Sequence, residues 1–62
     1  VPYLYNNLGI AYENTDKLKK AKEAYSKALT IDSNYHKAEV NLERVKRLLK
    51  EWDIKSASNL FD

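Results

Sequence analysis

The chain has 62 residues with one glycine, one proline and no cysteine, and eleven basic residues against nine acidic ones give a formal net charge of +2. A chain this short forms at most one small domain, and without cysteine it has neither a disulfide framework nor a thiolate metal site, so we expect a reducing, cytoplasmic location. No apolar run approaches the roughly 20 residues that span a bilayer, so we expect no membrane partner.

The first element expected is a helix over residues 3–13. Pro2 stands where a first-turn proline is tolerated, and because the chain begins at Val1 we expect it to be a segment of a longer protein. One apolar face follows the i, i+4, i+7 spacing of a helix, with two tyrosines beside it. Its residues are Leu4, Leu8, Ala11, Tyr5 and Tyr12. The polar run Asn14-Thr15-Asp16 then ends the helix in a turn, because short polar side chains compete for backbone hydrogen bonds.

A second helix is expected over residues 17–31. Its apolar positions again follow helical spacing and include three alanines, which allow a neighbouring helix to come close: Leu18, Ala21, Ala24, Tyr25, Ala28 and Ile31. The lysines of residues 17–22 alternate with Leu18 and Ala21, which is typical of the solvated face of an amphipathic helix. No nucleic-acid-binding motif accompanies them, so we expect no nucleic-acid partner.

A third helix is expected over residues 35–51, after the polar turn Asp32-Ser33-Asn34. Its apolar residues are separated by three and four positions in alternation, which is the a and d spacing of a seam between paired helices. They are Tyr35, Ala38, Leu42, Val45, Leu49 and Trp52. The tail that follows contains Ile54, Leu60 and Phe61 among polar residues, and it either adds a last helical turn or frays.

The first two helices resemble the tetratricopeptide repeat, whose signature is an ordered set of residues over a 34-residue period. Five residues match that signature: Leu8, Gly9, Tyr12, Ala21 and Ala28. Tyr5 and Tyr25 place another aromatic where the family has Trp and Phe, and Ser33 stands where the family prefers proline.

A second copy of the pattern begins 34 residues further on and is then lost. Asn41 and Leu42 repeat Asn7 and Leu8, but Glu43 and Lys46 replace the glycine and tyrosine of the signature. The third helix therefore resembles the polar capping helix of a repeat array.

The resemblance implies an all-α fold, an antiparallel helical hairpin plus a third helix in a right-handed stack. The expected units are the hairpin over residues 1–34, the capping helix over 35–52 and the C-terminal tail over 53–62. Gly9 has no side chain and is expected to let the second helix approach near Ala28. Tyr12 and Tyr25 are expected to fill the space between the paired helices, where a buried tyrosine hydroxyl needs a hydrogen-bond partner.

In the proteins that this chain resembles, the first helix of each pair lines a concave groove that holds a peptide. Helical spacing places these residues in that groove: Tyr3, Asn6, Asn7, Ile10 and Glu13 on the first helix, and Lys37, Val40, Asn41, Arg44 and Arg47 on the third. An asparagine amide both donates and accepts, so Asn7 and Asn41 suit a peptide backbone, and the bases favour an acidic partner. The alternative interpretation is that the asparagines cap internal turns and the bases stay in water.

The sequence contains no recognisable set of catalytic residues. His36 is the single histidine, and no metal-ligand spacing or nucleophile accompanies it. Glu39 and Glu43 lie one turn apart among bases, which favours helix ion pairs over acid–base chemistry. We therefore expect no enzyme activity, cofactor or metal, and a scaffold-like role in protein binding.

Two other functions compete with peptide binding. The seam of the third helix is longer than one hairpin can cover, so we expect the chain to form a homo-oligomer through apolar residues near its C-terminal end: Leu48, Leu49, Trp52, Leu60 and Phe61. The competing outcome is that the C-terminal tail folds back over the seam within one chain. A microtubule-interacting-and-transport type three-helix domain, which binds helical peptides, is the other alternative. Gly9 followed by Tyr12 favours the repeat hairpin over it.

Overall fold

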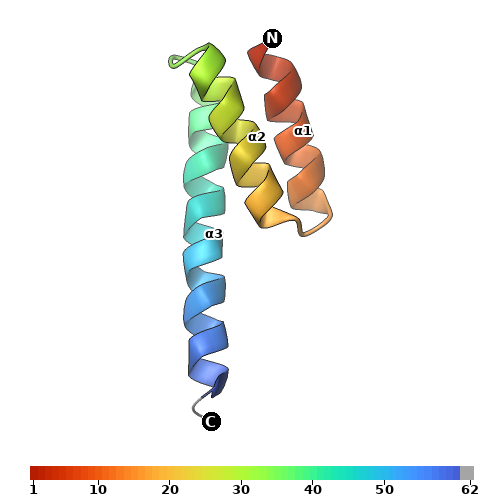
Figure 1. The fold of residues 1–62 in the computed structure, drawn as a ribbon. Coiled ribbons are helices and arrows are strands. Elements are labelled where there is room, and N and C mark those ends of the chain that lie inside the picture. The colour runs from red at the N-terminus through yellow and green to blue at the C-terminus, as the bar shows by residue number, and fades with distance from the viewer. Residues whose placement is uncertain (61–62) are drawn as a thin grey trace.

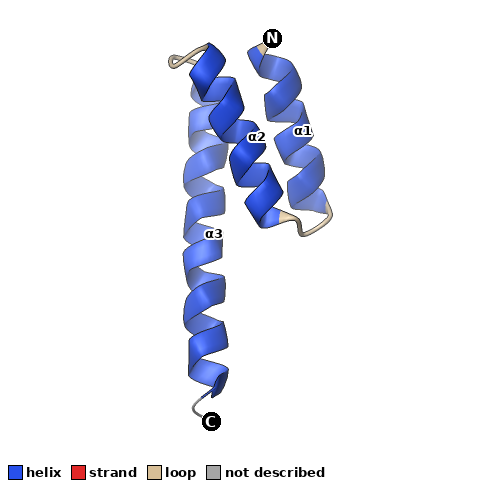
Figure 2. Ribbon diagram, in the orientation of Figure 1, coloured by secondary structure: helices blue, strands red, loops and turns tan. Residues whose placement is uncertain are grey.

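Three α-helices make up the chain: α1 (Pro2–Asn14), α2 (Leu18–Ile31) and α3 (His36–Leu60) (Figure 1; Figure 2). The computed structural model describes the backbone of residues 1–60 and the side chains of residues 1–55. Successive helices run in opposite directions, so α1 and α3 are parallel to each other and α2 is antiparallel to both (Figure 1). The predicted all-α fold with a hairpin and a third helix is confirmed.

Both predicted turns are present and are held by local hydrogen bonds. After α1, the Lys17 amide donates to the Tyr12 carbonyl at 2.8 Å, and Asp16 adopts φ of 60°, a left-handed conformation that aspartate tolerates better than most residues. After α2, the amide of Asn34 donates to Asp32 Oδ1 at 3.0 Å. These short turns place each helix directly beside its predecessor.

The hairpin closes where Gly9 of α1 meets Tyr25 of α2. A Cβ on Gly9 would lie 2.6 Å from Cδ1 and 2.8 Å from Cζ of the Tyr25 ring, so a hydrogen at that position makes room for the aromatic ring. Close approach at Gly9 was predicted, and the group nearest to Gly9 is the ring of Tyr25. The Tyr25 side chain is 0% exposed.

The core lies between α2 and α3. Ala21 and Tyr25 of α2 pack against Leu42 and Val45 of α3. Partly buried side chains surround this cluster: Tyr12, Leu18, Leu29 and Leu49. The predicted seam of α3 is therefore covered as far as Leu49.

The apolar face predicted for the first helix is covered only in part. Leu4 and Leu8 are 56% and 43% exposed, whereas Tyr12 packs against the core and Gly9 meets the ring of Tyr25. Periodicity identified the apolar residues of this helix, but not which of them meet the neighbouring helix.

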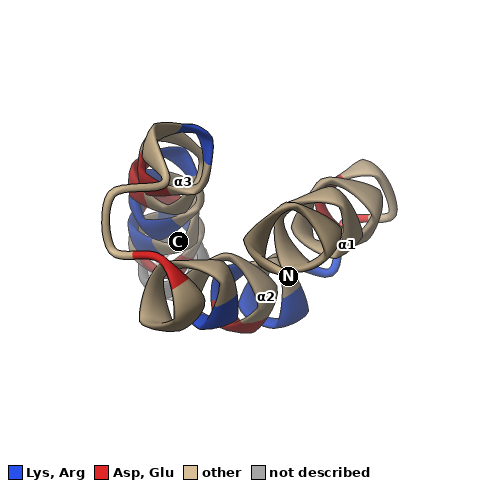
Figure 3. Cartoon of the chain, turned by 90° about the horizontal axis from the view of Figure 1, so that it is seen from above, with Lys and Arg blue, Asp and Glu red and all other residues tan. Residues whose placement is uncertain are grey.

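The third helix is longer than predicted. It begins at His36 and continues to Leu60, whereas the sequence placed its end near Glu51 and assigned the following residues to a tail. Its 25 residues compare with 14 in α2, so its C-terminal part extends past the end of the hairpin (Figure 1). Seen along the helix axes, α2 forms the base of the molecule and α1 and α3 stand on two sides of an open, concave face (Figure 3).

Candidate functional site

The concave face is closed at its floor by a hydrogen bond between α1 and α3. Asn41 Nδ2 donates to Asn6 Oδ1 at 2.9 Å. Asn6 is 4% exposed, and a buried amide of this kind is stable only when it is hydrogen-bonded. The asparagine pair therefore fixes the relative position of the two parallel helices.

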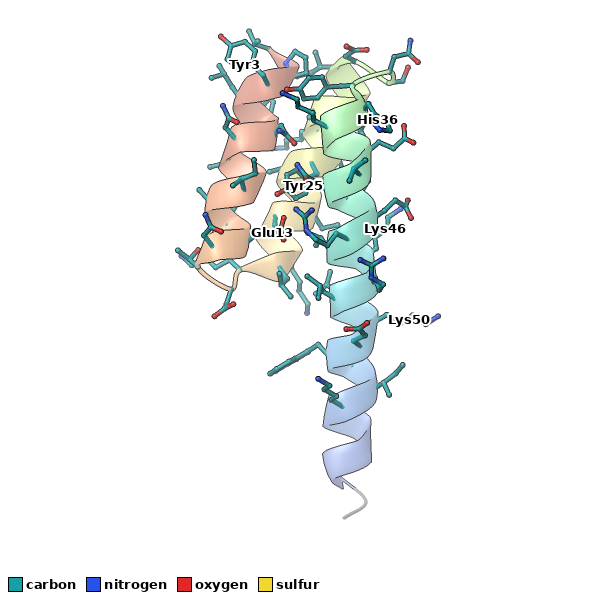
Figure 4. The ribbon with its side chains drawn as sticks, turned by 180° about the vertical axis from the view of Figure 1, so that it is seen from behind. Tyr3, Glu13, Tyr25, His36, Lys46 and Lys50 are labelled. Carbon is teal, nitrogen blue, oxygen red and sulfur yellow. The ribbon has the colours of Figure 1, made fainter. Side chains whose placement is uncertain are left out.

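Two turns further along α1, the Glu13 carboxylate accepts hydrogen bonds from both other helices. The Tyr25 hydroxyl donates to Oε1 at 2.6 Å, and Arg44 donates from Nη2 to Oε1 at 2.6 Å and from Nε to Oε2 at 3.1 Å. Arg44 Nη2 also donates to Asn41 Oδ1 at 2.8 Å. This last hydrogen bond joins the asparagine pair to the bonds around Glu13, so all three helices share one network. We call this network the polar floor: Asn6, Glu13, Tyr25, Asn41 and Arg44. Figure 4 shows Glu13 and Tyr25 lying close together between the helices.

The spacing of the sequence produces this network. Asn6 and Glu13 are seven residues apart, two turns of a helix, and therefore lie on the same side of α1. Asn41 and Arg44 are three apart and share a side of α3 for the same reason. Because α1 and α3 run parallel, the two residues of α1 face the two residues of α3.

The network also determines the charge state of its members. The hydrogen bonds from Arg44 lower the pKa of Glu13 below its ordinary value, because they stabilise the carboxylate. Burial raises the pKa of Tyr25 well above its ordinary value, and the neighbouring Glu13 carboxylate raises it further. Tyr25 therefore remains a neutral hydroxyl donor, Glu13 remains an anionic acceptor, and the positive charge of Arg44 is largely neutralised within the protein.

Of the residues predicted to line the groove, the structure brings Asn6, Glu13, Asn41 and Arg44 together and commits their side chains to one another. The remaining ones are exposed: Tyr3, Asn7, Ile10, Lys37, Val40 and Arg47. Sequence spacing did not identify Glu13 as the acceptor for the buried tyrosine. The signal was present, because a buried Tyr25 needed a partner and Glu13 shares a helix side with Asn6.

A shallow depression of about 300 Å³ lies on the α3 side of this face. It is lined by Glu39, Val40, Glu43, Arg44 and Arg47. Two acidic and two basic side chains accompany one valine, so this surface is mostly polar.

The predicted self-association surface lies at the other end of α3. Leu48 and Leu49 are half-buried, whereas Trp52 is 65% exposed. Leu49 and Trp52 line a hollow of about 470 Å³ together with Asp16, Leu18 and Lys19 at the hairpin turn. The side chain of Leu60 and all of Phe61 lie outside the described residues.

Neither a metal centre nor a membrane segment is found in the part of the chain that the structure describes. His36 is exposed at the start of α3, away from the polar floor (Figure 4). None of the described histidine, aspartate and glutamate side chains form a group of three that fits a metal ion. None of the described helices combines the length and apolar character needed to cross a bilayer.

Comparison with known proteins identifies the hairpin. The family model described as Tetratricopeptide repeat matches residues 2–35, more than half of the chain, and those residues contain α1, α2 and the turn that leads into α3. No curated protein and no solved structure matches the chain. The chain therefore belongs to the tetratricopeptide repeat family, whose repeats generally mediate protein–protein interactions and are typically not enzymes.

Proposed function

We propose that the chain is an interaction module that binds an extended peptide of a partner protein across its concave face. The observation that carries this proposal is the polar floor, because it ties α1 to α3 through hydrogen bonds, while the other residues that helical spacing assigns to the same face stay exposed. On α1 these are Tyr3, Asn7 and Ile10. Lys37 and Arg47 supply the corresponding charge on α3.

The partner that this face fits carries acidic residues beside apolar ones. Arg44 already donates to Glu13, so it adds little charge to the face, whereas Lys37 and Arg47 are exposed cations. Ile10 and Val40 are exposed apolar side chains that an aliphatic residue of the peptide can cover. The exposed amide of Asn7 offers one donor and one acceptor for a peptide backbone.

The test is a charge reversal that does not disturb the polar floor. Lys37→Glu with Arg47→Glu should weaken the binding of a short acidic peptide, and titration with that peptide should shift the amide NMR signals of Asn7 and Val40. Lys46→Glu with Lys50→Glu makes the same change in net charge on side chains that point away from the hairpin (Figure 4). Equal loss of binding in both double variants would show that net charge, and not this face, attracts the peptide.

A second function is self-association through the C-terminal part of α3. Trp52 and Ile54 are 65% and 60% exposed on a helix that extends past the hairpin, and this exposure favours a homo-oligomer. Covering a side chain of this size contributes about 1.5–3 kcal/mol. Sedimentation of the chain should show an oligomer that Leu49→Gln with Trp52→Gln dissociates. A monomer at high micromolar concentration, unchanged by those substitutions, contradicts self-association.

A further inference from the structure

Arg44 uses most of its hydrogen-bond donors within the protein. A guanidinium group carries N–H donors in a planar fork, one on Nε and two on each terminal nitrogen. Nε and Nη2 donate to the two oxygens of Glu13 at 3.1 and 2.6 Å, and Nη2 also donates to Asn41 Oδ1 at 2.8 Å. Within the described part of the chain, Nη1 has no acceptor. Arg44 is nevertheless 40% exposed, so a ligand can reach it.

These hydrogen bonds leave no paired edge of Arg44 for a second carboxylate. A carboxylate binds arginine most strongly through two parallel hydrogen bonds, either from Nε with Nη2 or from Nη1 with Nη2. Glu13 occupies the first edge. Asn41 takes the remaining hydrogen of Nη2, which leaves the second edge incomplete. A carboxylate of a bound peptide can therefore use Nη1 alone.

Glu13 is itself held in place by a second partner. Its side chain is 15% exposed, and the Tyr25 hydroxyl of α2 donates to its Oε1 at 2.6 Å. A peptide that displaced Glu13 from Arg44 would leave a partly buried carboxylate without its charged partner, which costs free energy. A peptide carboxylate therefore meets an arginine whose charge is already matched.

The exposed part of Arg44 lies where the proposed peptide binds. It lines the depression of about 300 Å³ on α3 together with Val40 and Arg47. Glu39 and Glu43 line the same depression, and neither forms an ion pair with a side chain of residues 1–55. The depression thus combines one arginine that is bound to Glu13 with a second arginine, Arg47, that is exposed.

We propose that Glu13 competes with the partner for Arg44 and so sets the charge specificity of the concave face. The proposal rests on the peptide binding described above. Lys37 and Arg47 take the acidic residue of the partner, whereas Arg44 offers it only Nη1, which suits a single acceptor such as a backbone carbonyl. One contact then has two opposite effects, because it joins α1 to α3 and weakens the attraction for an acidic peptide.

The test compares two labelled peptides that differ only in charge. The acidic probe is a short peptide with two glutamates beside a leucine, and the neutral probe has glutamines in place of the glutamates. Glu13→Gln frees the paired edge of Arg44, so fluorescence anisotropy should show the acidic probe binding this variant about fivefold more tightly than wild type. That gain corresponds to about 1 kcal/mol, the upper value for an exposed ion pair. The neutral probe should bind both proteins equally.

Two control variants separate the release of Arg44 from the change in net charge. Glu43→Gln removes one negative charge from the same depression but breaks no hydrogen bond to Arg44. Its gain for the acidic probe should stay below about twofold, since salt screens a charge that is not in contact. In an Arg44→Gln background, Glu13→Gln should add no more than Glu43→Gln does. Circular dichroism at the assay temperature shows whether each variant is folded.

A measurement on the wild-type chain needs no variant. During titration with the acidic probe, the Nε–H NMR signal of Arg44 should keep its position, because that hydrogen stays on Glu13. The corresponding signal of Arg47 should shift. Equal shifts of the two signals would show that the peptide displaces Glu13, which contradicts the proposal.

Other results also overturn the competition between Glu13 and the partner. Weaker binding of the acidic probe by Glu13→Gln would mean that Glu13 orients Arg44 for the ligand. An equal gain in Glu43→Gln, or a gain that persists without Arg44, would mean that net charge is responsible. An equal gain for the neutral probe would mean that the variant opens the face. In each case the wild-type chain still binds the probe, so the proposed function stands. If neither wild type nor Glu13→Gln binds either probe, both proposals are wrong.

Discussion

Replacing Glu13 by glutamine tests whether the polar floor holds the three helices together. The carboxylate is 15% exposed and accepts three hydrogen bonds, one from Tyr25 and two from Arg44. Glutamine has nearly the same shape and keeps one acceptor oxygen, so the change removes charge with little change of volume. The side-chain amide replaces one acceptor with a donor, which sets it against the guanidinium.

The expected loss in the free energy of unfolding depends on the two partners of Glu13, which are Tyr25 and Arg44. A hydrogen bond to a charged group contributes about 1.5–3 kcal/mol when its partners are buried, but Arg44 is 40% exposed and its ion pair belongs nearer the surface value of about 0–1 kcal/mol. Because the amide oxygen still accepts from Tyr25, part of that bond remains. We expect Glu13→Gln to lower the free energy of unfolding at pH 7 by about 1–2 kcal/mol, and Tm by roughly 5–15 °C.

The effect should depend on pH with a defined sign. The pKa of Glu13 is lowered in the folded state, so its contribution is complete above the pKa of the unfolded chain and is lost as pH falls through the lower, folded pKa. Urea unfolding of both proteins from neutral pH into acid should therefore show a difference that is largest near pH 7 and shrinks toward zero in strong acid. Glu51→Gln, at an exposed carboxylate of α3, is the matched control and should show no such difference.

Two outcomes would refute this account of the polar floor. A difference between wild type and Glu13→Gln that stays constant through the acid range would mean that the charge of Glu13 is not involved. A loss at pH 7 no larger than that of the Glu51→Gln control would mean that the three hydrogen bonds contribute nothing beyond those made to water.

Other substitutions probe the remaining contacts. Gly9→Leu should destabilise the chain by about 1–3 kcal/mol or more, because the side chain enters the space of the Tyr25 ring; an unchanged Tm, as expected for the Ile10→Leu control, would contradict that packing. Asn6→Ala should cost about 1–3 kcal/mol in urea unfolding, since it leaves a partner amide unsatisfied, whereas Asn7→Ala at an exposed position should change stability by less than about 0.5 kcal/mol. Tyr25→Phe should cost about 0.5–1.5 kcal/mol by the same measurement, and a neutral result would show that the hydroxyl is satisfied equally well by water in the unfolded chain.

The sequence predicts the helices well because helix formation here is governed by local signals. The two polar runs at residues 14–16 and 32–34 place the ends of α1 and α2 within one residue of the observed bounds. The predicted end of α3 was wrong because residues 53–60 contain neither glycine nor proline, the residues that end a helix most strongly.

Tertiary contacts were harder to predict than helix positions. Asn6 and Asn7 are adjacent, and helical spacing alone placed both on the peptide-binding side; only the approach of α3 buries the first and leaves the second exposed. Gly9 was predicted correctly as a point of close approach, yet its partner depends on the rotation of α2 about its own axis. The sequence specifies the elements, and their packing decides which polar residues are interior.

The way in which α1 and α3 meet has a consequence for binding at the concave face. Each helix packs on α2 mainly through apolar side chains, whereas their direct contacts to each other include Asn6–Asn41 and Glu13–Arg44 hydrogen bonds. Apolar packing tolerates small sliding movements, but hydrogen bonds of 2.6 to 3.1 Å require a defined distance and direction. The width of the face is thereby preorganised before any partner arrives, and a ligand that fits it loses little free energy to ordering the receptor.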